Sequence, residues 1–84
     1  MATEEEFEQA VERSRSLPTN LTNDQLLALY GLYKQASVGD VQGKRPGMFD
    51  LKGRAKYDAW SKQKGKTKEQ AREAYIALVD SLAS

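Results

Sequence analysis

Apolar residues recur along this chain at the three- and four-residue spacing of amphipathic helices, and no stretch alternates in the manner of a strand. The first stripe is Phe7, Ala10, Val11 and Ser14. A second is Leu26, Leu29, Tyr30 and Tyr33. The clearest is Ala71, Ala74, Tyr75, Leu78, Val79 and Leu82. Stripes of this kind bury one helix face against another, so the pattern predicts an all-α fold.

Three predicted helices open with the same start signal. Thr3, Thr22 and Thr67 are each followed, three residues later, by an acid or an amide. This is the capping box, in which the two side chains satisfy backbone N–H groups that lack helical partners. The residue before a proline is disfavoured in a helix, so Pro18 should end the first helix, and the second should end near Ser37.

Residues 38–50 read as a loop because this stretch of 13 residues contains three glycines and a proline. Such a loop reaches at most about 43 Å, whereas a helix of about fifteen residues is about 22 Å long. The chain can therefore return alongside the second helix and start the third in the same direction. Asp50 is the expected N-cap of that helix, from Leu51 to about Gln63, with Leu51 and Ala55 in the core.

Composition narrows the range of functions. The 84 residues predict one domain, residues 1–84, with a thin core. Cysteine and histidine are absent, which removes disulfides, thiolate nucleophiles, zinc ligation by nitrogen or sulfur, and the usual neutral-pH general base. We therefore expect neither an enzyme nor a metal or other cofactor. The acidic N-terminal stretch lacks the apolar region of a signal peptide, and no apolar run approaches the length of a membrane span, which predicts a cytoplasmic protein without stable membrane insertion. We expect it to be a monomer.

Charge is distributed unevenly although the net charge is only +1. Residues 1–25 carry a net charge of −4, residues 26–68 carry +7, and residues 69–84 carry −2. A basic middle between acidic ends favours a defined anionic partner over general polyanion binding. A solvated lysine face is the common alternative.

Tyrosines and lysines gather beside the apolar stripes of three predicted helices. Tyr30, Tyr33 and Lys34 are spaced to project together from the second helix. Lys52 and Lys56 lie one turn apart on the third, and Tyr75 lies on the fourth. Taken singly, such tyrosines are most often core residues and such lysines solvated. Taken together, they suggest a shallow site for a ligand with phosphates, a flat ring and an apolar tail.

The segments that carry these residues also carry a resemblance to a known family. YGLYKQASVGD, then RPGMFDLKGRAKYDAW, then KGKTKEQAREAYI resemble the acyl-CoA-binding protein family in content, order and spacing. The match runs from about Phe7 to Leu82. Tyr57 stands where the family usually has a second tryptophan, and Asn20 where many members have a lysine.

The resemblance implies an up-down-down-up four-helix bundle that binds medium- to long-chain fatty acyl-CoA esters without catalysis and transports or buffers them in the cell. By position it implies a nucleotide site for the CoA phosphates and adenine, made of Arg15, Tyr30, Tyr33, Lys34, Lys52, Lys56 and Tyr75. It also implies that Leu26 and Leu27 line a groove for the acyl chain. Trp60 is expected in the core.

Two other readings compete with a ligand carrier. A basic segment with interleaved tyrosines is also typical of nucleic-acid binding, but the acidic first helix would repel an extended polyanion, so no nucleic-acid partner is expected. A helical bundle that binds a protein partner is the second alternative. An enzyme is the weakest reading because no nucleophile has an adjacent base.

Overall fold

The computed structural model describes residues 3–18 and 20–83. These residues form four helices and no strand, namely α1 (Glu4–Ser14), α2 (Asn23–Ser37), α3 (Leu51–Ser61) and α4 (Lys68–Ala83). The expected all-α four-helix bundle is thus confirmed. The predicted domain, residues 1–84, includes positions 1, 2, 19 and 84, which lie outside the described residues.

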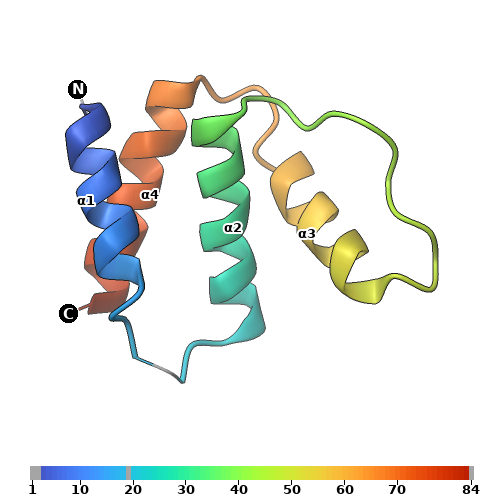
Figure 1. The fold of residues 1–84 in the computed structure, drawn as a ribbon, viewed down its shortest axis with the longest axis horizontal. Coiled ribbons are helices and arrows are strands. Elements are labelled where there is room, and N and C mark those ends of the chain that lie inside the picture. The colour runs from blue at the N-terminus through green and yellow to red at the C-terminus, as the bar shows by residue number, and fades with distance from the viewer. Residues whose placement is uncertain (1–2, 19, 84) are drawn as a thin grey trace.

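Helix α2 is the centre of the bundle. It packs against α4 on one side and α3 on the other, while α1 packs against α4. Figure 1 shows that α1 and α4 run in one direction and that α2 and α3 run in the opposite direction. This up-down-down-up order depends on the long connection between α2 and α3, which carries the chain back to the end where α2 began.

The three predicted capping boxes are present. Thr22 Oγ1 accepts a hydrogen bond from Gln25 N at 3.1 Å, and Thr22 N donates to Gln25 Oε1 at 2.8 Å. Thr3 and Thr67 make the same reciprocal pair of bonds at the starts of α1 and α4. Asp50 caps α3 by accepting from Gly53 N at 3.0 Å. Helix starts were thus readable from short-range chemistry alone.

The core lies between α1, α2 and α4. Its buried members are Phe7, Ala10, Leu29, Leu32, Ala36, Ala71, Tyr75 and Val79. The predicted stripe of α4 lies in this cluster or packs against it, and so does that of α1 except for Ser14. On α2 the buried positions centre on Leu29, Leu32 and Ala36, so Leu32 was missed and Leu26, which is 50% exposed, lies outside the core.

Helix α3 stands apart from this core because it packs only on α2. The expectation that Leu51 is a core residue is wrong, since its side chain is 74% exposed. Leu51 is the first residue of α3, and helical side chains point toward the helix N-terminus, so this one extends past the packed surface. Trp60 is half-buried, and its Nε1 donates to Gly39 O at 2.7 Å.

A buried amide joins the two loops beyond the C-terminal end of α2. Gln35 is 0% exposed, and its Nε2 donates to Asp40 Oδ1 and to Lys66 O, both at 2.8 Å. Asp40 Oδ1 also accepts from Gly65 N at 3.0 Å. The hydrogen bonds from Gly65 and Gln35 hold the pKa of Asp40 below its ordinary value. This network fixes the upper end of α2 against the segment that leads into α4.

Candidate functional site

The three α2 residues that were expected on one face lie on neighbouring sides of that helix. Tyr33 is 41% exposed and faces α1 and α4, with its ring centroid 6.0 Å from that of Phe7. Tyr30 and Lys34 are half-buried and contact α3. Helix α2 therefore separates a surface on its α1 side from a surface on its α3 side, and the predicted residues contribute to both.

On the α3 side, two lysines lie over aromatic rings. The Lys34 Nζ is 5.0 Å from the ring centroid of Trp60, and the Lys56 Nζ is 5.5 Å from that of Tyr30. Each pair joins α2 to α3. Within residues 3–18 and 20–83, no carboxylate lies within 4.0 Å of either lysine. A cation–π contact at a surface leaves most of a lysine's charge available, so both can still bind an anion.

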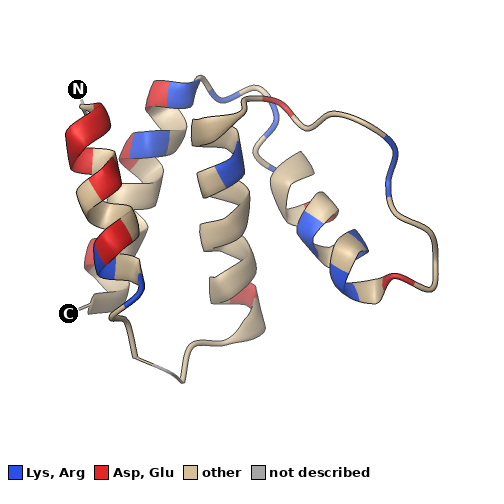
Figure 2. Cartoon of the chain, in the orientation of Figure 1, with Lys and Arg blue, Asp and Glu red and all other residues tan. Residues whose placement is uncertain are grey.

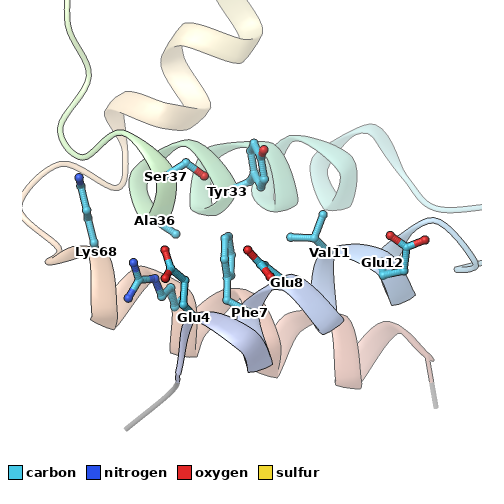
Figure 3. Close-up of a pocket in the computed structure, with 10 residues that line it drawn as sticks. Glu4, Phe7, Glu8, Val11, Glu12, Tyr33, Ala36, Ser37 and Lys68 are labelled. Atoms are coloured by element: carbon cyan, nitrogen blue, oxygen red, sulfur yellow. The ribbon is translucent and has the colours of Figure 1, made fainter.

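On the α1 side, a pocket with a volume of about 500 Å³ opens between α1, α2 and α4 (Figure 3). Phe7, Val11 and Tyr33 give it an apolar and aromatic wall. Lys68 and Arg72, from the first turns of α4, also line it. Ligand pockets commonly have volumes of about 300–1,000 Å³, so a flat ring fits this space.

Sequence reasoning missed the α4 cations of this pocket. Lys68 and Arg72 are four residues apart and so share one helix face, which was the available signal. Their charge is opposed by carboxylates of the same lining, which belong to Glu4, Glu8 and Glu12 on α1. The pocket is therefore mixed in charge, whereas the α3 side is cationic.

Tyr75 belongs to the core. It is 4% exposed, and its ring centroid is 5.3 Å from that of Phe7 and 6.3 Å from that of Tyr33. Edge-to-face and tilted contacts at these distances are the favourable arrangements of aromatic rings. Tyr75 thus packs against the ring of Tyr33 from the core side. Little of the surface of Tyr75 is accessible.

The remaining predicted residues lie around the edges of these two surfaces. Arg15 is the C-cap of α1, is exposed, and has Nη1 3.5 Å from Glu12 Oε2. Lys52 is exposed in the first turn of α3. Leu27 lines a cavity of about 230 Å³ between α2 and α3, and Leu26 is exposed one residue before it. Among the residues that the structure describes, no contact joins Arg15 or Lys52 to the two lysine–aromatic pairs.

The charges divide the molecule into two ends. Figure 2 shows acidic residues along α1 and basic residues along α3 and its preceding loop. Residues 44–58 carry five basic and two acidic side chains. Arg45 binds Asp58 through two hydrogen bonds of 3.0 and 2.7 Å, which lowers the pKa of Asp58 and raises that of Arg45. An anionic ligand is therefore favoured on the α3 side of α2.

Comparisons with known proteins point to one family. Residues 4–79 match the family model described as Acyl CoA binding protein. An acyl-CoA-binding protein of Ricinus communis is 50% identical over 82 residues, which cover 98% of this chain and 91% of that protein. An acyl-CoA-binding protein homolog of Drosophila melanogaster is 49% identical over 80 residues, which cover 95% of this chain and 93% of that protein.

Solved structures show the same arrangement of helices. The crystal structure of Oryza sativa acyl-CoA-binding protein 2 matches with a TM-score of 0.91 and 51% identity, over 93% of this chain and 87% of that one. The crystal structure of the protein from Moniliophthora perniciosa matches with a TM-score of 0.84 and 41% identity, over 92% and 76%. The family match over residues 4–79, the identity to these relatives and the shared fold show that the chain belongs to the acyl-CoA-binding protein family.

Proposed function

We propose that this protein binds medium- to long-chain fatty acyl-CoA esters and transports or buffers them without catalysis. One observation carries the proposal: Lys34 and Lys56 lie over aromatic rings of the α2–α3 surface and have no carboxylate within 4.0 Å among the described residues. Both cations are therefore free to bind phosphate. Membership of the family, whose relatives are named for acyl-CoA binding, supports the choice of ligand.

The lysines hold the phosphates of coenzyme A. A charge-assisted hydrogen bond from Lys34 or Lys56 contributes about 1.5–3 kcal/mol. The hydroxyl of Tyr30 lies on the ring that Lys56 covers and donates to a neighbouring phosphate or sugar oxygen. Arg15 and Lys52 act at the edges of the site, and Arg15 must first leave Glu12 to do so.

The adenine ring stacks on Tyr33. This side chain is 41% exposed and forms part of the pocket wall on the α1 side, so one face of its ring is accessible. Stacking of a base on an aromatic side chain contributes about 1–3 kcal/mol in nucleic-acid sites. Tyr75 assists by packing against the buried side of Tyr33, which limits the orientations that the ring can adopt.

The acyl chain follows the groove between α2 and α3. Leu27 lines the cavity there and Leu26 is exposed at the same end of α2, so both offer apolar surface that a tail can cover. Each buried methylene contributes about 0.8 kcal/mol. A dozen methylenes therefore match the phosphate contacts in magnitude, and tight binding requires the tail and the nucleotide together.

We further propose that this carrier acts in the cytoplasm as a monomer. The sequence contains no histidine and no cysteine, which supports a binding function over a catalytic one. Cell fractionation tests the location, and sedimentation of the loaded protein tests the monomeric state.

Chemical-shift mapping with palmitoyl-CoA tests the function and the site in one experiment. We expect saturation at one ligand per chain, with the largest backbone amide shifts at Tyr30, Tyr33, Lys34 and Lys56. A parallel titration with free CoA should shift these residues while leaving Leu27 unchanged. Shifts spread evenly over the surface, or confined to α1 and α4, would contradict the proposal.

A further inference from the structure

The connection between α2 and α3 ends in a turn that exposes large apolar side chains. Phe49 is 96% exposed, Met48 is 68% exposed, and Leu51 is 74% exposed at the start of α3. Soluble proteins tolerate single exposed apolar residues. Three of them within four positions of the sequence indicate an interaction surface. The proposed ligand site does not use them.

The turn presents these side chains in a fixed way. Asp50 N donates to Gly47 O at 3.0 Å, which closes a four-residue turn with Met48 and Phe49 at its two central positions. Turn centres normally hold glycine, proline, asparagine or aspartate, which suit the backbone and leave nothing apolar in water. Here the two central positions hold Met48 and Phe49, whose apolar side chains are exposed to water.

The rest of the connection is held against α3. Trp60 Nε1 donates to Gly39 O at 2.7 Å, and the Tyr57 hydroxyl donates to Gly43 O at 3.0 Å. Arg45 is bound to Asp58 by two hydrogen bonds. These contacts fix the chain as far as Arg45, so the apolar turn projects from a supported base.

Basic residues flank the turn in the sequence. Lys44 and Lys52 are exposed on either side of it, and residues 44–58 have a net charge of +3. The carboxylate within the turn, Asp50, is occupied by the N–H of Gly53 at the start of α3. Figure 2 shows the acidic helix α1 at the opposite end of the molecule. When the turn contacts a negatively charged surface, the acidic helix therefore stays far from that surface.

We propose that Met48, Phe49 and Leu51 form a docking tip, inserted reversibly into the interface of an anionic lipid bilayer and flanked by Lys44 and Lys52. Among the described residues no helix is long and apolar enough to cross a bilayer, so the contact is peripheral. A protruding apolar turn with a basic border fits a soft negative surface, where side chains enter singly and cations pair with headgroups. A protein partner would instead need a cleft of its own that matches this protruding turn.

The position of the docking tip suggests what such docking serves. The N-terminal ends of α2 and α3 lie at the same end of the bundle, and the tip directly precedes α3 (Figure 1). Leu26, which is exposed near the N-terminal end of α2, lies at that same end, so docking brings the surface proposed for the acyl chain near the lipid. This last step rests on the proposed function, whereas docking itself does not.

Site-specific fluorescence tests the insertion directly because the sequence contains no cysteine. Phe49→Cys and, as a matched apolar control in α2's C-cap, Val38→Cys are each labelled with an environment-sensitive dye. Both are mixed with vesicles of phosphatidylcholine alone and with vesicles that also contain phosphatidylserine. We expect a blue shift and a rise in intensity at position 49 with the anionic vesicles, and no change at position 38. No change at 49, or an equal change at both positions, overturns the proposal.

Unlabelled variants measure the strength of docking. Phe49→Ser should reduce binding to anionic vesicles about tenfold or more, and Lys44→Gln about fivefold, while Lys64→Gln on the α3–α4 loop serves as the charge-matched control with a smaller effect. If vesicle binding is unaffected by Phe49→Ser but is reduced by Lys64→Gln, the proposed docking tip is wrong and a different face of the protein binds the vesicles. Palmitoyl-CoA affinity should be unchanged in Phe49→Ser, so a failure of docking is distinguishable from a failure of ligand binding.

Discussion

Replacing Lys56 by alanine tests the phosphate contact with little risk to the fold. The side chain is exposed, and among the described residues it has no carboxylate partner, so its contact within the protein is the one with the ring of Tyr30, at 5.5 Å. A surface cation–π contact contributes about 0.5–1 kcal/mol. Lys56→Ala should therefore lower the free energy of unfolding by no more than about 1 kcal/mol.

The expected loss of binding is larger. A charge-assisted hydrogen bond to phosphate contributes about 1.5–3 kcal/mol, and each 1.4 kcal/mol corresponds to a factor of ten. Lys56→Ala should thus weaken palmitoyl-CoA binding about 10-fold to 100-fold. The loss should shrink at high salt, because screening already weakens the contact in the parent protein.

Calorimetric titration of the variant measures this difference, with denaturant unfolding run alongside to verify the fold. Lys64→Ala is the matched control, since it removes the same charge from the exposed α3–α4 loop. The control should bind within about twofold of the parent, because a solvated charge that makes no contact with the ligand is screened. An unchanged affinity in Lys56→Ala, or an equal loss in both variants, would remove Lys56 from the site and refute the phosphate contact.

Three further outcomes follow from the same structure. Tyr33→Leu should weaken palmitoyl-CoA binding about tenfold by loss of stacking, and an unchanged calorimetric affinity would place adenine elsewhere. Val79→Ala, at a position 0% exposed, should lower the free energy of unfolding by about 2 kcal/mol, which urea unfolding measures and a value near zero would contradict. Arg45 lowers the pKa of Asp58, so this group stabilises the fold above about pH 4 and ceases to do so as pH falls through its folded pKa. Asp58→Asn should therefore flatten the loss of stability on acidification, and identical acid-unfolding profiles would count against the ion pair.

The sequence was most informative where the chemistry is local. The capping boxes at Thr3, Thr22 and Thr67 fixed three helix starts, because each involves residues only three apart. The length of the loop between α2 and α3 allowed the parallel pair, since chain reach is a property of residue number. The apolar stripe of α4 predicted its buried face for the same reason: periodicity does not depend on the partner.

The contacts that the sequence did not predict depend on how the helices and loops pack against one another. Tyr33 and Lys34 are adjacent, yet one contacts α1 and α4 while the other contacts α3, because α2 is packed on two sides. Leu51 was expected in the core and is exposed, since α3 lacks a second packing partner. Gln35 gave no sign of burial, because its partners Asp40 and Lys66 come from two different loops.

The most direct test of the account is calorimetric titration of the delipidated protein with palmitoyl-CoA, and with free CoA and palmitate in parallel. The account predicts one ester bound per chain, with an affinity far above that of either fragment, because phosphate contacts and methylene burial contribute comparably. An ester that binds no more tightly than palmitate would contradict it. The lysines over Tyr30 and Trp60 would then be part of a solvated surface, and no phosphate site would exist between α2 and α3.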